Sequence, residues 1–391
     1  MNALEWRATL SLGAIYALRM VGVFMILPIF EIYARNLPQH PGPFMVGFAL
    51  TVSGLTQALL QIPLGRLSDR IGRKPVIALG MLVFAAGSFV AGISDRIELI
   101  ALGRALQGAG AISSAVTALL ADVTRETVRT TAMAIMGAGM GFAFVVALVL
   151  GPVAEGLLGG VRGIFHLAAG LAVLTLPVIW WAAPAREPAV RRAGVSVRQV
   201  LADRQILNLS AGILILHATL ICLFTGVPLL IQSDLGWAPE QHWKVYLPIL
   251  LATLVLALPL MRHADRNGAR RLLLGAVALL AGSLLVAGMV PGTVGLVGGL
   301  ALFFLPFNLL EGLLPSLISR LAPAQAKGAA LGVYATAQFL GQPVGGMLGG
   351  WAMTHYGPSG VLTAAAALPL LWLGFAVRLR EPHPRAVAAA E

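Results

Sequence analysis

Long runs of apolar residues, separated by short polar segments, organise the whole chain. A helix of about 20 apolar residues crosses a bilayer, and the sequence contains twelve runs of this kind. They cover approximately residues 8–34, 44–64, 75–94, 97–121, 131–157, 162–182, 207–232, 243–261, 272–290, 293–319, 328–355 and 358–378. The pattern predicts an all-α membrane protein with twelve transmembrane helices.

One polar segment is much longer than the others. Residues 183–206 contain Pro and five Arg and follow the sixth apolar run, so we expect a cytoplasmic linker there, with a short amphipathic helix over 195–205. The linker divides the chain into two six-helix bundles, over residues 1–182 and 207–380. Residues 381–391 are expected to form a cytoplasmic tail.

The loops after the second and the eighth apolar runs resemble each other. Asp69 and Asp265 each begin the pattern Asp-Arg-x-Gly-x-Lys/Arg, and they lie 196 residues apart. A repeat of this length indicates duplication, and paired bundles suit alternating access with a substrate site between them.

Composition excludes several classes of protein. With 58% hydrophobic and 11% charged residues, the chain is too poor in charge for a soluble enzyme or a disordered protein. The single cysteine, Cys222, excludes an intramolecular disulfide and a cysteine-based zinc site. The net charge of +11 is not a sign of nucleic-acid binding, because its distribution follows the spans.

Basic residues lie mainly on one side of the predicted membrane. When the loops are assigned alternately, 21 of the 27 Lys and Arg residues fall on the side of the termini and 4 on the other side. The positive-inside rule therefore places both termini in the cytoplasm. The remaining two, Arg19 and Arg104, fall inside spans.

Ionisable residues within a membrane are costly and usually functional. Arg19 shares a helix face with Tyr16, and Arg104 shares one with Gln107. Both arginines are candidates for proton coupling. A structural role, such as tying neighbouring helices together, is the alternative for each.

Glu311 is the most central acid, with Asn308 on the same face. A low-dielectric site disfavours its ionised form, so it is a candidate to load and release protons; a neutral carboxyl that only bonds a neighbour is the alternative. His217 is a further coupling candidate, or a satisfied core residue. Glu31 and Glu155 lie near the external helix ends, where we expect solvation.

Two helices carry amide pairs on one face. Gln57 and Gln61, and likewise Gln338 and Gln342, are four residues apart and should face the protein interior rather than lipid. Together with Tyr334 they predict a largely apolar cavity with few polar groups, suited to amphiphilic or aromatic substrates. Ordinary helix–helix hydrogen bonding is the alternative for each pair.

Glycine-rich stretches fall inside spans, over 137–141 and 345–350, where small residues let backbones approach. They are not nucleotide loops. The sequence has no phosphate loop, zinc motif or Ser/His/Asp grouping, so neither a cofactor nor a metal is expected.

The loop after the second span contains Gly65, Asp69, Arg70, Gly72, Arg73 and Lys74. This set of residues resembles a motif of the major facilitator superfamily. The resemblance implies a conformational latch at Asp69 that favours the outward-open state, with Asp122 as a possible partner of Arg70. A fifth-helix motif, formed by Gly151, Pro152 and Gly156, is similar to that of drug/proton antiporters, and the segment 100–111 resembles the fourth-helix motif of proton-coupled members.

Segments 18–20, 307–311 and 327–334 resemble the YajR-like branch of bacterial exporters, which carries a C-terminal soluble domain that we do not expect in this sequence. The resemblance implies a proton-coupled exporter of small molecules in the bacterial inner membrane. Its partners would be the substrate, protons and the lipid bilayer, with no nucleic acid, and the chain is expected to be a monomer.

A symporter or uniporter of the same fold is the main alternative. A membrane-embedded enzyme and a non-transporting sensor or scaffold are less favoured, because the sequence offers neither a catalytic cluster nor large extensions.

Overall fold

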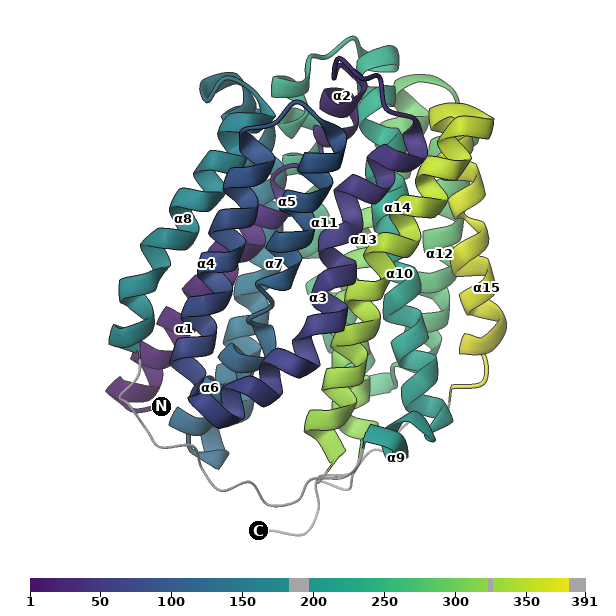
Figure 1. The fold of residues 1–391 in the computed structure, drawn as a ribbon. Coiled ribbons are helices and arrows are strands. Elements are labelled where there is room, and N and C mark those ends of the chain that lie inside the picture. The colour runs from purple at the N-terminus through teal and green to yellow at the C-terminus, as the bar shows by residue number, and fades with distance from the viewer. Residues whose placement is uncertain (183–196, 323–325, 380–391) are drawn as a thin grey trace.

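The computed structural model describes residues 1–182, 197–322 and 326–379, and within these ranges the chain is helical without a strand (Figure 1). The helices run side by side as a bundle. We call the end where α1 begins and α15 ends the base, and the opposite end, which carries α2, the roof. The elements are α1 (Ala3–Phe24), α2 (Phe30–Arg35), α3 (Pro43–Ile71), α4 (Arg73–Gly92), α5 (Ile97–Ala109), α6 (Ser113–Val123), α7 (Glu126–Leu157), α8 (Val161–Ala182), α9 (Val197–Leu201), α10 (Arg204–Leu235), η1 (Pro239–Gln241), α11 (Trp243–Asn267), α12 (Arg270–Met289), α13 (Gly292–Leu321), α14 (Lys327–Ala365) and α15 (Ala367–Ala376).

The twelve predicted crossings are present. The described residues contain 11 apolar helical segments long enough to span a membrane, and the last of them, Gly328–Ala376, has 49 residues. That is more than twice the length of one crossing, and the helix breaks at Gly357, where φ is 68°. This segment therefore crosses twice, as the predicted runs 328–355 and 358–378 require.

The first predicted span, 8–34, is wrong in detail. The helix α1 ends at Phe24, and the short helix α2 begins only at Phe30. Pro28 lies between them and has no N–H to continue a helix. The fourth crossing is likewise divided into α5 and α6, which are separated at Gly110.

The connection between the two halves is only partly described. Residues 183–196 of the predicted linker and the tail 381–391 lie outside the described residues. The expected helix over 195–205 is the shorter α9, and α10 begins at Arg204, before the predicted start of the seventh span at 207. Asp203 sets that start, because its side chain accepts hydrogen bonds from the backbone N–H groups of Gln205 and Ile206.

The internal repeat is visible in the backbone. Gly72 is the one residue between α3 and α4, with φ 98° and ψ 153°. Gly268, 196 residues later, directly follows α11 with φ 91° and ψ 143°, and Ala269 alone separates it from α12. Glycine adopts positive φ without strain. The predicted loop after the second span is therefore mostly helix, because α3 continues past Pro63 and ends only at Gly72.

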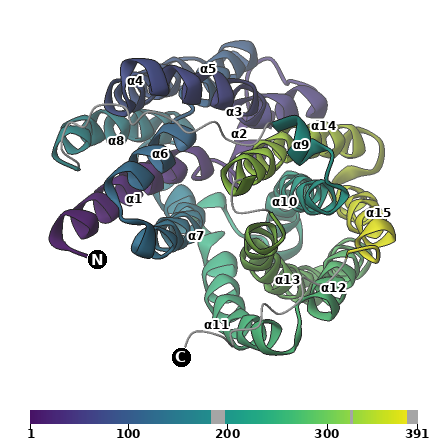
Figure 2. The same cartoon turned by 90° about the horizontal axis from the view of Figure 1, so that it is seen from below.

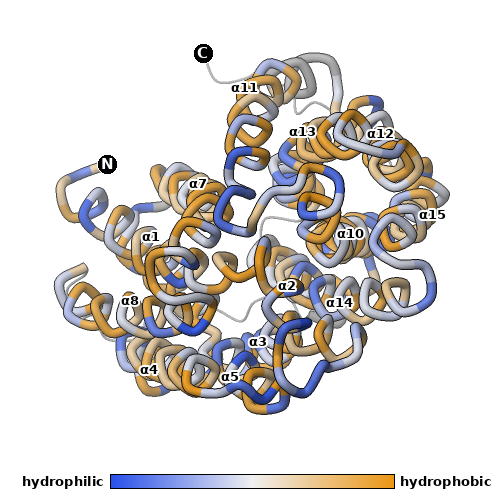
Figure 3. The backbone as a smooth tube through the Cα atoms, turned by 90° about the horizontal axis from the view of Figure 1, so that it is seen from above, coloured by the Kyte–Doolittle hydropathy of each residue, from blue (hydrophilic) through white to orange (hydrophobic). Residues whose placement is uncertain are grey.

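The two halves of the chain lie beside each other. Seen from the base, α1 and α3 to α8 occupy one side and α10 to α15 the other, and α3 lies against α14 while α7 lies near α11 (Figure 2). Seen from the roof, hydrophobic residues run along the helices and many hydrophilic residues gather in the connections (Figure 3).

Glycines bring α3 and α14 together across the two halves. A Cβ at Gly47 would lie 2.1 Å from the carbonyl oxygen of Gly346, so the backbones touch there. The expectation of close approach is confirmed for the stretch 345–350. It is wrong for Gly137, Gly139 and Gly141, where a Cβ would meet nothing within 4 Å.

Gly47→Ala should destabilise the protein. The new methyl group would overlap the backbone of α14, and overpacking of this kind costs about 1–3 kcal/mol. We expect a lower Tm in detergent. Gly139→Ala is the matched control, because its methyl group meets open space, and it should be neutral or raise the Tm through the helix preference of Ala. Equal Tm changes in both variants would contradict the close contact.

Candidate functional site

Two arginines lie in a polar network inside the first half. Nη2 of Arg19 on α1 donates to Oε1 of Gln57 at 3.0 Å and to the carbonyl oxygen of Gln107 at 3.4 Å. Arg104 on α5 donates to Oε1 of Gln107 at 2.6 Å, and Gln107 donates to Oγ of Ser88 at 2.7 Å. Both arginine residues are 1% exposed. The network joins α1, α3, α4 and α5, so the structural role left open for the arginines is fulfilled, and coupling stays a prediction.

The central acid lies in the second half. Oε1 of Glu311 on α13 is 3.5 Å from Nδ1 of His217 on α10. The amide nitrogen of Gln338 on α14 lies 3.1 Å from Nε2 of the same histidine. With that amide as donor, the ring proton lies on Nδ1, which faces Glu311. The side chain of Glu311 is 32% exposed, so the neighbouring helices do not enclose it completely.

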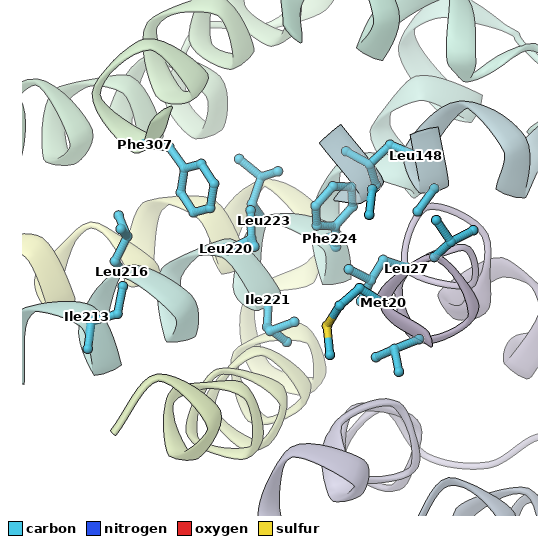
Figure 4. Packing of buried hydrophobic residues seen from close by; sticks show 14 of the residues in the cluster. Met20, Leu27, Leu148, Ile213, Leu216, Leu220, Ile221, Leu223, Phe224 and Phe307 are labelled. Atoms are coloured by element: carbon cyan, nitrogen blue, oxygen red, sulfur yellow. The ribbon is translucent and has the colours of Figure 1, made fainter. Parts of the chain in front are cut away.

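Apolar side chains separate these two polar groups. The ring of Phe144 on α7 has its centroid 5.3 Å from that of Phe24 and 6.1 Å from that of Phe307. Phe307 also neighbours His217, with centroids 6.3 Å apart. Leu148 on α7 and Phe307 on α13 belong to the same buried cluster (Figure 4). The interface between the halves is therefore aromatic and apolar at this depth.

The remaining predicted cavity residues lie mainly in contacts between helices. Gln61 accepts a hydrogen bond from Ser113 of α6 at 2.9 Å, and Tyr16 contacts the same serine. Asn308 donates to Thr253 of α11 at 3.1 Å. Gln342 packs against α3, where a Cβ at Gly54 would lie 2.8 Å from its Oε1 atom. Tyr334 is buried on α14. Their role in substrate binding stays a prediction.

The predicted latch residues bind one another at the base. Arg73 forms ion pairs with Asp69 and with Asp122, the latter at 3.3 Å, and donates to Ser68 at 2.7 Å. The expected pairing of Asp122 with Arg70 stays a prediction. Lys74 donates to the carbonyl oxygen of Trp180 on α8 at 3.1 Å.

The glycines of the two motifs mark tight contacts. A Cβ at Gly65 would lie 3.1 Å from Oγ of Ser114. A Cβ at Gly151 would lie 2.0 Å from the carbonyl oxygen of Met25, so α7 approaches the segment after α1. Gly156 faces Glu240 of η1, and Pro152 lies within α7 without ending it. The fifth-helix motif therefore lies at the roof, where the halves meet.

One ion pair was not anticipated from the sequence. Glu5 accepts from Nε of Arg125 at 2.8 Å and from its Nη2 at 3.1 Å, which ties the start of α1 to the start of α7. The pattern Asn2-x-x-Glu5 is a capping signature, and the capping box is present. That signal marks Glu5 as a helix-end residue but gives no sign of a partner 120 residues away.

The acid on α2 also differs from expectation. Glu31 is 1% exposed, so the expected solvation is wrong; its partner is Arg35, at 3.2 Å. Desolvation by burial raises the pKa of Glu31 to about 7, against the lowering effect of Arg35. The position of Glu31 near a helix end does not indicate that α2, at the roof, packs against α3 and α10.

Twelve apolar crossings in two related halves, with polar groups held between the helices, define a multi-pass membrane transporter. The sequence profile described as Major Facilitator Superfamily matches residues 12–342 and, in a second match, 209–391. The chain therefore belongs to the major facilitator superfamily.

Relatives agree with this assignment. The chain is 43% identical to the inner membrane transport protein YajR of Escherichia coli, over 97% of this chain and 84% of that one. It is 29% identical to the multidrug resistance protein MdtH of Aeromonas hydrophila, over 91% and 89%. A crystal structure of a bacterial homologue of the human lysosomal transporter Spinster, inward-facing and occupied, superposes with a TM-score of 0.80 at 14% identity over 97% of both chains, which shows the shared fold. These proteins are transporters, not enzymes.

Glu31→Gln should remove a pH dependence of stability. Below pH 4.5 the carboxyl is protonated in both the folded and the unfolded chain. Between pH 4.5 and about 7 the unfolded chain loses this proton while the folded one keeps it, so stability falls as pH rises through this window. The wild-type Tm should fall across the window relative to that of the variant. Glu98→Gln, at a side chain 54% exposed, is the control; a parallel pH profile for wild type and Glu31→Gln would contradict the assignment.

Proposed function

We propose that this protein is a proton-coupled exporter of small amphiphilic molecules, working by alternating access as a monomer in the bacterial inner membrane. The names of its relatives, an inner membrane transport protein and a multidrug resistance protein, support export. The apolar and aromatic interface between the halves supports an amphiphilic substrate, since it offers a large contact area with few fixed hydrogen-bonding groups.

The observation that carries the proposal is the setting of Glu311. This acid lies ten residues before the end of α13, at 32% exposure, and its one ion-pair neighbour among the described residues is His217. An acid in such a site is stabilised by taking up a proton, because no permanent positive charge compensates the carboxylate. Proton binding would alternate with substrate binding in the same space.

The arrangement of contacts supports a state closed at the roof. Gly47 touches Gly346 and Gly156 faces Glu240, and both contacts join the halves toward the roof. The positive-inside rule would place the roof outside the cell. The ion pair between Asp69 and Arg73 joins the end of α3 to the start of α4.

Glu311→Gln should abolish proton coupling. Glutamine keeps the size and hydrogen-bonding capacity of the acid but cannot exchange a proton. In proteoliposomes with an imposed pH gradient and a panel of amphiphilic compounds, wild-type protein should show proton movement that depends on substrate, and the variant should show none.

Glu98→Gln serves as the control in this assay, because it removes an acid that lies at the roof and is exposed. It should transport like the wild type. Substrate-dependent proton movement that persists in Glu311→Gln would place the coupling group elsewhere.

Asp69→Asn should weaken transport without preventing insertion. The partly exposed ion pairs of the latch are worth about 1 kcal/mol or less, so the rate should fall by up to about fivefold. The measurement is uptake into inside-out vesicles, normalised to the amount of folded protein. A rate equal to that of the wild type would remove the latch role from Asp69.

A further inference from the structure

Two positive charges are buried in the first half without a negative one. In the described part of the chain, neither Arg19 nor Arg104 has a carboxylate within ion-pair distance. Their hydrogen-bond partners are the neutral groups already described, together with the carbonyl oxygen of Leu50, which accepts from Arg104 at 2.7 Å. The ring of Phe84 lies 5.4 Å below the guanidinium of Arg19. Uncompensated charge in a site of low dielectric is expensive.

The groups left without partners in this network are all able to donate. They are Nε and Nη1 of Arg19, Nε of Arg104, Nε2 of Gln57 and Oγ of Ser53. Each belongs to a side chain that is at least nine-tenths buried. The amide oxygens of Gln57 and Gln107 each already accept one hydrogen bond from an arginine. The site therefore has more hydrogen-bond donors than acceptors to pair with them, and it carries positive charge that no carboxylate balances.

The donors come from neighbouring positions. Leu50, Ser53 and Gln57 occupy one face of α3, at helical spacing. Arg104 binds the first of these residues and Arg19 binds the last, so Ser53 lies between the two guanidinium contacts. On the adjacent helix, Gly108 brings α5 against α3, since a Cβ there would lie 1.9 Å from the carbonyl oxygen of Ser53.

We propose that the buried Arg19–Arg104 network is an anion-binding site for a small monovalent anion, either a halide or a carboxylate group. An anion accepts several hydrogen bonds at once and also cancels charge, whereas a water molecule accepts bonds but leaves the charge in place. The acid of the second half does not serve here, because Glu311 faces His217 on the other side of the apolar interface.

The test is anion-dependent stability of the purified full-length protein. In detergent, sodium methanesulfonate, which has no carboxylate, is replaced stepwise by sodium chloride or by sodium acetate at constant ionic strength, and Tm is recorded. A ligand that binds the folded state alone raises Tm in a saturable way. A response to chloride identifies a halide site, a response to acetate identifies a carboxylate site, and a response to both identifies the shared chemistry.

Variants separate this site from general salt effects. Arg19→Gln should lose the response. Because that variant could fail to fold, Gln57→Glu is the second test. It places a carboxylate beside Arg19, so the protein should be at least as stable as wild type in methanesulfonate and should no longer respond. Gln199→Glu makes the same change at an exposed position of α9 and should respond like the wild type.

Two outcomes would overturn the proposal: a wild-type Tm that neither anion changes, or a full response in Gln57→Glu. The assay needs no pH gradient and no transport. A negative result in this assay therefore says nothing against proton coupling through Glu311. A transporter without proton coupling would, in turn, say nothing against the anion site.

Discussion

The interior of a bilayer offers no hydrogen-bond partner, and every polar group at that depth must find one within the protein. The backbone meets this demand by forming helices. Side chains meet it by pairing across helices: Arg19 with Gln57, for example, and Asn308 with Thr253. These pairs decide which helix faces turn inward, so the same bonds that satisfy the polar groups also set the arrangement of the bundle.

Contact between the halves depends on a different feature, glycine residues that have no side chain to separate the backbones. Gly47 and Gly346 let two backbones touch, and the neighbouring interface is aromatic, with Phe144 against Phe307. Neither contact contains a hydrogen bond that must be broken before the halves can move. Polar bonds hold each half together, while small and apolar residues form these two contacts between the halves. This division suits a molecule whose halves rock as units.

Much of the fold could be predicted from the sequence, because it depends on local properties. Twelve apolar runs became twelve crossings, and the repeated loop became the matched glycines Gly72 and Gly268. The errors have a common cause. Glu31 was expected in solvent and is buried, and Gly139 was expected against a helix and faces open space. Whether a residue is covered depends on neighbours that are distant in the chain.

The candidate site likewise has features that the sequence predicts and features that depend on packing between distant parts of the chain. By itself the sequence determined the crossings and which residues carry charge at membrane depth, because hydropathy and helical period are properties of consecutive residues. Only the tertiary structure decided that Glu311 lies beside His217 and that Arg19 lies among neutral amide groups. Whether a buried charge is compensated depends on groups within a few ångströms, and these come from helices whose packing no local pattern records.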